Sequence, residues 1–238
     1  MKRINYGIDA PHVIRNLVMA SVIGFLLPIF LPVINIGRVR FDTSGFIPMG
    51  IACGLMAVWM ILYSVYGKRL HRDRILNMFD WKGTEKVLDV GTGRGLMVIG
   101  AAKRLTTGKA TGIDIWNIED LTKNTMDNTL TNAALESVQD KVEIINDNAV
   151  HMRFPDQTFD VVISNLCLHN IYNPEDRKKA CAEIGRVLKE GGTAILSDFR
   201  HMKEYQANFN QDGFQTEMES PNYFLTFPPL AILKIKKM

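Results

Sequence analysis

Three closely spaced glycines between an apolar strand pattern and an apolar helix pattern mark the segment best suited to bind a ligand. The stretch is VLDVGTGRGLMVIG, residues 87–100. Glycine has no Cβ atom, so a ligand can approach the backbone amides of such a turn closely. A helix that opens directly after the turn also presents the positive end of its dipole there. We expect Gly91, Gly93 and Gly95 to contact a small molecule.

An acidic residue at the end of the next strand pattern narrows the identity of that molecule. Asp114 ends the stretch ATGID, which follows the glycine turn by about 20 residues. In a doubly wound sheet both features lie at the carboxyl ends of the strands, where ligands bind. A carboxylate in this place can accept hydrogen bonds from the two hydroxyls of a ribose. The sequence therefore predicts an adenosine-containing ligand.

The spacing of the glycines separates two kinds of adenosine ligand. A dinucleotide fingerprint reads GxGxxG, and Leu96 stands where its third glycine should be. None of the six tyrosines has a lysine four residues on, as a short-chain dehydrogenase would require. A phosphate-binding loop of the GxxxxGK[ST] type is absent as well. A nucleotide-dependent oxidoreductase remains the alternative enzyme.

The elements that position these residues alternate between strand and helix. Continuous apolar strands in such an alternation are typical of a parallel sheet covered on both faces. We expect an α/β fold with a doubly wound, mostly parallel seven-stranded sheet and an antiparallel final strand. The expected strands are residues 86–90, 110–115, 142–146, 160–164, 193–198, 214–218 and 230–235, and the expected helices are residues 96–105, 119–135, 174–188 and 203–210.

Four segments in this order resemble the class I, Rossmann-like S-adenosylmethionine-dependent methyltransferases of the small-molecule type. They are EKVLDVGTGRG, TGIDIW, FPDQTFDVVISNLCLHNI and RVLKEGGTAILSDF, and the resemblance covers roughly residues 75–200. The resemblance implies a single catalytic domain that uses S-adenosylmethionine as methyl donor. The three cysteines show no metal-ligand spacing, so we expect no metal site.

The resemblance assigns roles to residues at the carboxyl edge of the sheet. The methionine part of the cofactor would contact Asp89 and the turn Gly91, Thr92, Gly93, Arg94 and Gly95. Asp114 would bind the ribose hydroxyls, and Ile115 would lie against the adenine. In this family an Asp-Ala pair usually lies near the adenine amino group, and here Asn148 and Ala149 stand in that place, with Asp147 as a substitute for the missing aspartate. Asn165 would face the reacting centre.

Methyl transfer needs little from catalytic side chains. The sulfonium methyl is already activated, so alignment of donor and acceptor and exclusion of water are the main requirements. A general base is needed only if the acceptor loses a proton before it attacks. The sequence does not identify such a base. His169, Asp198 and His201 are candidates by position alone, and a structural or substrate-shaping role is the alternative for each.

Two uncharged apolar runs precede this domain. They are Leu17–Ile36 and Phe46–Tyr66, of 20 and 21 residues. About 20 apolar residues in a helix cross the 30 Å hydrocarbon core of a bilayer. Neither run has the polar stripe that the helix of a soluble core normally keeps. We expect a transmembrane hairpin in residues 1–67, with spans at 17–36 and 46–66 and a short joining loop, and a methyltransferase domain in residues 68–238. A short linker at about Lys68–Arg74 should separate the second span from that domain. Buried soluble helices or a cleaved signal peptide are the alternatives.

The basic residues around the two runs predict their orientation. The outer flanks carry Lys2, Arg3, Arg15 and the cluster Lys68–Arg74, whereas the joining loop carries Arg38 and Arg40. The positive-inside rule then places both termini and the catalytic domain in the cytoplasm, at the cell membrane. This side agrees with the cytosolic supply of S-adenosylmethionine.

An anchor of this kind suggests a substrate without identifying it. A lipophilic acceptor such as a quinone precursor, a lipid or an isoprenoid fits a pocket held near the headgroups, but a hairpin that only anchors an enzyme for a soluble acceptor fits as well. Small residues at Ala20, Gly24, Gly50 and Gly54 allow close helix packing, either within the hairpin or in a homodimer. A membrane scaffold with an inactive methyltransferase fold is the remaining alternative. The small net charge of +3 gives no indication of nucleic-acid binding.

Overall fold

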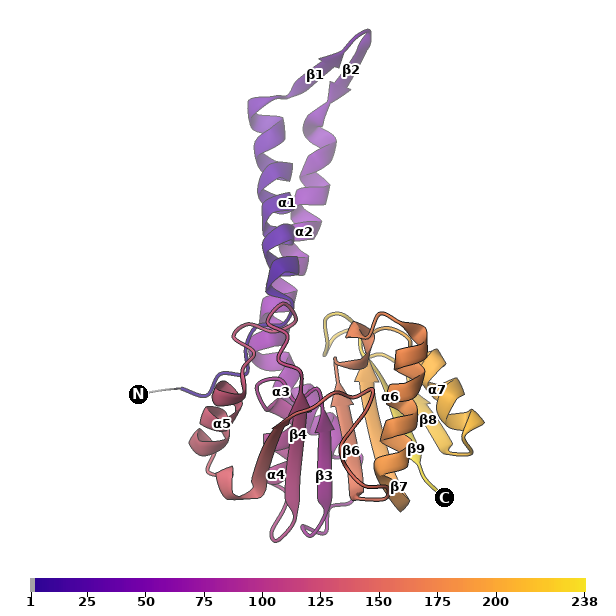
Figure 1. The fold of residues 1–238 in the computed structure, drawn as a ribbon. Coiled ribbons are helices and arrows are strands. Elements are labelled where there is room, and N and C mark those ends of the chain that lie inside the picture. The colour runs from indigo at the N-terminus through magenta and orange to yellow at the C-terminus, as the bar shows by residue number, and fades with distance from the viewer. Residues whose placement is uncertain (1–2) are drawn as a thin grey trace.

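The computed structural model describes residues 3–238 and shows a sheet domain from which a long helical hairpin projects (Figure 1). Lys2, which enters the charge comparison above, lies outside the described residues. The hairpin leaves the domain at the edge of the sheet where the parallel strands end (Figure 1).

The sheet has seven strands in the order β5-β4-β3-β6-β7-β9-β8. Strand β9 runs antiparallel to both of its neighbours, and the other pairs are parallel. The expected doubly wound sheet with an antiparallel final strand is therefore confirmed. The strands are β3 (Lys86–Val90), β4 (Lys109–Asp114), β5 (Val142–Asn146), β6 (Phe159–Asn165), β7 (Leu188–Asp198), β8 (Gln215–Glu219) and β9 (Ala231–Lys236).

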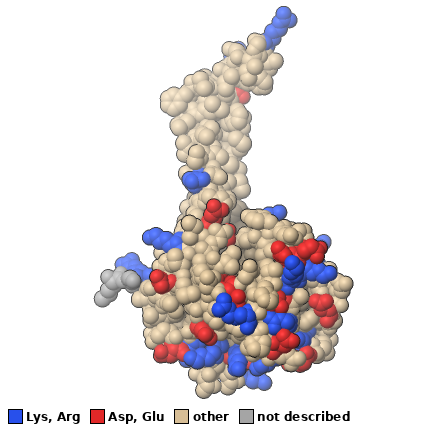
Figure 2. All heavy atoms as spheres, in the orientation of Figure 1, with Lys and Arg blue, Asp and Glu red and all other residues tan. Residues whose placement is uncertain are grey.

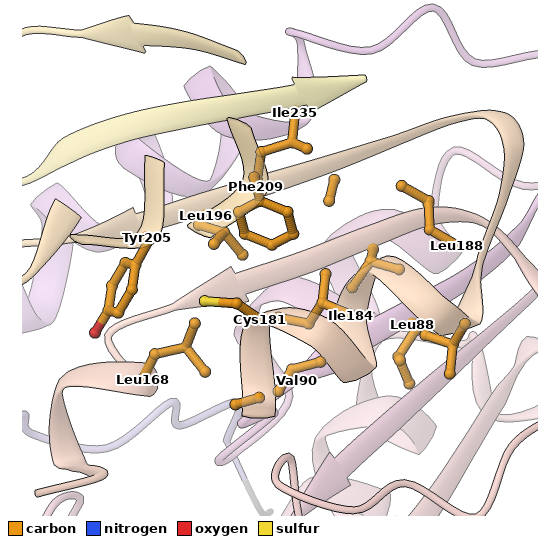
Figure 3. Close-up of a cluster of buried hydrophobic side chains, with 14 of the residues drawn as sticks. Leu88, Val90, Leu168, Cys181, Ile184, Leu188, Leu196, Tyr205, Phe209 and Ile235 are labelled. Atoms are coloured by element: carbon orange, nitrogen blue, oxygen red, sulfur yellow. The ribbon is translucent and has the colours of Figure 1, made fainter. Parts of the chain in front are cut away.

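Helices cover both faces of this sheet, because alternate side chains of each buried strand point to opposite faces. One face packs against α6 (Pro174–Val187) and α7 (Met202–Gln211), and Figure 3 shows the apolar side chains between them. The other face packs against α3 (Lys68–Leu76), α4 (Leu96–Ala102) and α5 (Met126–Leu135). In β3, Leu88 belongs to the first core and Val87 to the second, and both are fully buried.

The helix expected at residues 119–135 is shorter than predicted. It begins only after Thr125, whose side chain accepts a hydrogen bond from the backbone N–H of Asn128 and so caps α5. Lys123 has a left-handed φ of 53°, which a helix cannot accommodate. Residues 115–125 therefore form a loop at the carboxyl edge, where they become part of the site described below.

The first apolar helix is also displaced from its predicted position. It is α1 (Pro11–Phe30) instead of residues 17–36. Pro11 occupies the first turn, where proline is tolerated, and Pro32 prevents the helix from continuing. Residues 31–45 then form a two-stranded hairpin, β1 (Val33–Ile36) and β2 (Val39–Asp42), and the short helix η1 (Thr43–Gly45), instead of a simple loop.

The second apolar helix runs into the sheet domain without a linker. Helix α2 (Phe46–Leu62) passes through a π-helical turn, η2 (Tyr63–Gly67), directly into α3. The prediction that Lys68–Arg74 form a short linker is thus wrong. One face of α3 is buried against the sheet domain, and its His71 Nε2 lies 2.7 Å from the Ser197 hydroxyl oxygen. Burial lowers the pKa of His71 to about 4, so this contact involves a neutral imidazole.

The hairpin leaves its apolar side chains uncovered. Two helices, Pro11–Phe30 and Thr43–Leu76, are long and apolar enough to cross a membrane. Only 6% of the first apolar window and 17% of the second are buried within the chain, so neither helix belongs to the core. In Figure 2 the hairpin is almost free of charged residues between its tip and its base.

Small residues let the two helices of the hairpin pack closely. A Cβ atom at Gly24 of α1 would lie 2.7 Å from the Cα of Gly50 in α2, and one at Gly54 would lie 2.9 Å from the Ser21 hydroxyl oxygen. Gly24, Gly50 and Gly54 thus pack at the contact between the two helices of the hairpin. This arrangement is the small-xxx-small packing found in membrane helices.

Gly24→Ala should destabilise the hairpin, because the new methyl group meets backbone atoms that cannot move aside. We expect a loss of about 1–3 kcal/mol, the usual cost of overpacking. The measurement is denaturant unfolding of the full chain in detergent micelles. Gly45→Ala is the matched control, since a Cβ at Gly45 meets no atom within 4 Å. Equal unfolding midpoints for the two variants would contradict the packing described here.

Candidate functional site

One pocket at the carboxyl edge of the sheet brings together most of the predicted cofactor-binding residues. These residues come from the ends of β3, β4, β5 and β6, which lie side by side. The predicted residues that line the pocket are Gly91, Thr92, Gly93, Arg94, Asp114, Ile115, Asp147, Asn148, Ala149 and Asn165. Asp89 and Gly95 do not line it: Asp89 is buried beside the turn, and Gly95 caps α4.

The turn after β3 requires glycine at three of its five positions. Gly91, Gly93 and Gly95 have φ values of 77°, 52° and 86°, in the left-handed region that favours glycine. A Cβ at Gly91 would lie 2.3 Å from the Cys167 sulfur. The backbone at Gly91 is therefore exposed to the pocket, and the Cys167 thiol, in the loop after β6, lies beside it.

Asp89 supports this turn from within the core. Its Oδ2 accepts hydrogen bonds from the Thr92 hydroxyl at 2.7 Å and from the Val98 backbone N–H at 2.9 Å. Its Oδ1 is buried and has no hydrogen-bond partner among residues 3–238. Burial raises the pKa of Asp89 to about 7, and the charge of Asp114 adds to the increase, while the two hydrogen bonds oppose it.

Asp114 is held in place by three donors. Its Oδ2 accepts from the Gly93 backbone N–H at 2.7 Å, and its Oδ1 accepts from the Trp116 backbone N–H at 2.6 Å and from the Asn124 side chain at 3.3 Å. A carboxylate offers about four acceptor positions, so one remains free for a hydroxyl group. A second ligand hydroxyl would replace the longer bond from Asn124.

The predicted adenine-binding side chains after β5 already form hydrogen bonds within the chain. Asn148 Oδ1 accepts from the Val150 backbone N–H at 3.0 Å, which leaves one lone pair for a ligand. Asp147 accepts from the backbone N–H groups of Asn148 and Arg153 and forms an ion pair with Arg153. Both side chains thus stabilise a turn as well as line the pocket.

Two amide side chains in the pocket have buried oxygens available for a ligand. The Oδ1 atoms of Asn165, at the end of β6, and of Asn124 are buried and have no hydrogen-bond partner in the described part of the chain. A buried acceptor without a partner is costly, so a ligand N–H or O–H group would compensate it. Together with the bare turn at Gly91, these oxygens fit a ligand that presents several donors.

The sequence did not identify the segment that closes the pocket from the N-terminal side. Tyr6 and Lys68 line the pocket, and the Lys68 ammonium donates to the carbonyl oxygens of Tyr6 and Gly7 at 2.9 and 2.6 Å and lies 3.3 Å from Asp9. The Ser64 hydroxyl in η2 donates to Asp9 as well. Residues 4–10 thus connect the base of the hairpin to the site.

The other end of this segment contacts α5 and the loop before it. Asn5 exchanges two hydrogen bonds with Asn132, and the Ile8 backbone N–H donates to Thr122. Asp120, Leu121 and Asn124 are pocket residues that the sequence prediction missed because a helix was expected over residues 119–135, and Asn117 just before it was missed as well. The pairing of Asp9 with Leu121 joins two segments that are distant in sequence, and neither segment has a periodic pattern that could reveal it.

The three candidate general bases do not line the pocket. His169 Nδ1 lies 2.9 Å from Asp198, which is buried, and the backbone N–H of His169 donates to the same carboxylate. His201 Nδ1 lies 3.2 Å from the Glu204 carboxylate at the start of α7. His169 is nearer to the site, because the next residue, Asn170, lines the pocket.

Residues 88–196 match the sequence profile of the family described as "Methyltransferase domain". A ubiquinone/menaquinone biosynthesis C-methyltransferase of Roseobacter denitrificans is 26% identical over 156 residues, which are 64% of this chain and 59% of that protein. The aligned segments span about half the length of the curated relatives.

Solved structures share the fold at low sequence identity. An S-adenosylmethionine-dependent methyltransferase of Aquifex aeolicus has a TM-score of 0.56 at 17% identity, over 70% of this chain and 89% of that chain. A [4+2]-cyclase has a TM-score of 0.59 at 16% identity, over 92% of this chain and 93% of that chain. At these identities the likeness shows the fold alone.

The raised pKa of Asp89 predicts a pH-dependent stability. Between its ordinary pKa of 3.8 and about 7, the folded chain keeps a proton that the unfolded chain releases. The free energy of unfolding should therefore fall as the pH rises through this range, by up to about 4 kcal/mol at 1.36 kcal/mol per pKa unit. Asp89→Asn cannot ionise and should lose this slope.

Urea unfolding of both proteins between pH 4 and 8 measures the difference. Asp140→Asn, an exposed site, is the control and should keep the wild-type slope. Parallel profiles for the wild type and Asp89→Asn would show that the Asp89 carboxyl does not titrate as described.

Proposed function

We propose that the chain is a membrane-anchored enzyme that methylates a small acceptor with S-adenosylmethionine, from the premise that residues 88–196 match the methyltransferase domain profile. The observation that carries the proposal is the position of the pocket. The pocket lies at the carboxyl edge of the sheet. The apolar hairpin projects from the same edge (Figure 1). Lys68 lines the pocket and also continues the second apolar helix.

We place the cofactor along the carboxyl edge. The turn from Gly91 to Gly95, with Asp89 supporting it, would hold the methionine part, and Asp114 would accept from the ribose. Ile115 and the turn at Asp147, Asn148 and Ala149 would surround the adenine. The buried Asn165 oxygen would face the methionine amino group, which supplies the N–H donors that this acceptor lacks.

S-adenosylmethionine supplies a sulfonium methyl group that is already activated for in-line displacement. The chain's own contribution is then to orient the acceptor and exclude water. Tyr6 and the segment around it cover one side of the pocket, and Leu121 and Ile171 add apolar wall. His169, oriented by Asp198, is the residue best placed to take a proton from an acceptor that must lose one.

The membrane part of the proposal follows from the exposure of the hairpin. Apolar side chains on every side of α1 and α2 face outward, as expected for helices in lipid. The excess of Lys and Arg on the outer flanks supports the proposal that both termini and the sheet domain lie in the cytoplasm, at the cell membrane. The close packing of Gly24 on Gly50 gives the hairpin an interface of its own, so a homodimer is not needed to explain these glycines.

We propose a lipophilic acceptor, such as a quinone precursor, a lipid or an isoprenoid. The support is the short distance along the chain between the apolar helix and the pocket wall, together with the similarity to a C-methyltransferase of ubiquinone and menaquinone biosynthesis. A hairpin serving only as an anchor for a soluble acceptor would not require the pocket to open beside it.

Asp114→Asn should weaken binding of S-adenosylhomocysteine by about 10- to 100-fold, the usual effect of losing a hydrogen bond to a charged group. The amide nitrogen would also meet one of the donors, such as the Gly93 N–H, that now bond the carboxylate. Titration calorimetry of the detergent-solubilised chain is the measurement, with Asp140→Asn as control. Unchanged affinity in Asp114→Asn, or no binding by the wild type, would contradict the cofactor site.

The acceptor class can be tested by partition of a transferred label. The purified chain is incubated with methyl-labelled S-adenosylmethionine and either membrane or cytosolic extract, and Asp114→Ala provides the background. We expect label to accumulate in organic-soluble products of the membrane extract. Label confined to water-soluble products of the cytosolic extract would contradict a lipophilic acceptor.

A further inference from the structure

We propose that the loops around the base of the hairpin form a second membrane contact, which opens the pocket directly toward the bilayer. This inference rests on the proposed membrane hairpin and deepens the proposed function, because it names the route of the acceptor. The loops are residues 115–122, 166–173 and 220–230. Their most exposed apolar side chains are Ile115, Ile118, Tyr172, Tyr223 and Phe224.

The topology places these three loops at one edge of the sheet. The first two follow the carboxyl ends of β4 and β6. The third precedes β9, which runs antiparallel to β7 and pairs its first residue, Ala231, with the last residue of β7, Asp198. All three loops therefore lie at the edge from which the hairpin projects (Figure 1).

Two of the loops touch the base of the hairpin. A Cβ at Gly67, in the last turn before α3, would lie 2.9 Å from the carbonyl oxygen of Leu225. On the other side, the Ala10 backbone N–H at the start of α1 donates to the Asp120 carbonyl oxygen at 3.1 Å. The loops thus lie at the level at which both helices leave the sheet domain.

The length of the second apolar helix brings the bilayer to this level. Residues 46–66 contain no charged side chain, and 21 residues of helix extend over about 31 Å, close to the thickness of the hydrocarbon core of about 30 Å. Tyr66, the last of them, is 67% exposed. On the α2 side, a bilayer that covers this run reaches Tyr66, and the exposed Arg15 of α1 can extend its long side chain to the headgroups. The headgroup region then lies beside the loops at Gly67.

The chemistry of the loops fits the boundary between acyl chains and headgroups. Tyr223 is 67% exposed and Phe224 is 87% exposed, which is unusual for aromatic side chains in contact with water. Aromatic residues are enriched at membrane interfaces, and basic residues attract anionic lipid there. The exposed Arg69, one turn beyond the π-helical segment, supplies a positive charge at this level.

Two of the three loops, residues 115–122 and 166–173, also line the pocket. Ile115, Asn117 and Leu121 line it from one loop, and Asn170 and Ile171 line it from another. The exposed Ile118 lies between the lining residues Asn117 and Leu121 in sequence, and the exposed Tyr172 directly follows Ile171. An acceptor dissolved in the bilayer would therefore reach the pocket between the two loops without crossing water.

Site-specific fluorescence quenching tests the contact. A single cysteine is introduced into the full chain carrying Cys53→Ala, at Phe224, at Leu55 of α2, or at Leu135 at the opposite end of the domain. Each variant carries an environment-sensitive NBD label and is reconstituted into vesicles of phosphatidylcholine and phosphatidylglycerol. Two doxyl-labelled lipids are the quenchers, one with its nitroxide near the headgroups and one with its nitroxide deep in the acyl chains. Burial raises the pKa of the remaining thiols, Cys167 and Cys181, which makes them slow to react, and the labelled parent gives the background.

We expect the deep quencher to act on the label at 55 and the shallow quencher to act on the label at 224, each several-fold more strongly than on the label at 135. Quenching at 55 without excess quenching at 224 would overturn the second contact and leave the hairpin proposal intact. That result would also show that the exposed aromatic residues face water or a protein partner. If the label at 55 is not quenched, the membrane hairpin itself is wrong, and this inference fails with it.

Discussion

The buried ammonium group of Lys68 joins the parts of the molecule that the site depends on. It is only 4% exposed, and burial lowers its pKa, an effect that the neighbouring Asp9 opposes. A charge in this position requires partners, and it finds them in two backbone carbonyls and one carboxylate. These partners belong to residues 6–9, the segment that enters α1 and closes the pocket. The hairpin, the N-terminal segment and the pocket wall thus share one electrostatic contact.

The parts of the site that follow local rules were accessible from the sequence. Gly91, Gly93 and Gly95 signalled a turn with left-handed backbone, and Asp114 signalled the end of a parallel strand, because each signal lies within a few residues. The fold class, a mostly parallel sheet covered on both faces, follows from the alternation of strand and helix and from the apolar strands. The extent of the apolar runs was less well predicted, because composition does not show where Pro11 and Pro32 begin and end a helix.

What the sequence did not reveal depends on contacts over long separations. Asn5 bonds with Asn132, and Lys68 with Tyr6, across 127 and 62 residues. The segment KRLHRDR resembles a solvated linker, yet Lys68, His71, Ile75 and Leu76 form a buried stripe at helical spacing in α3. Because Lys68 and His71 are polar, the sequence pattern did not indicate a buried helix face. Similarly, Asp120 and Leu121 lie in a loop whose amide and acidic side chains favoured the prediction of a polar helix.

The unbroken passage from α2 through the π-helical turn into α3 has a mechanical consequence. A flexible linker would let the sheet domain turn independently of its anchor, whereas a continuous helix transmits tilt. Membrane helices change their tilt with the thickness of the surrounding bilayer. If the hairpin lies in lipid, local membrane thickness would therefore set the angle between the sheet domain and the bilayer. Lipid composition would then change the direction in which the pocket opens.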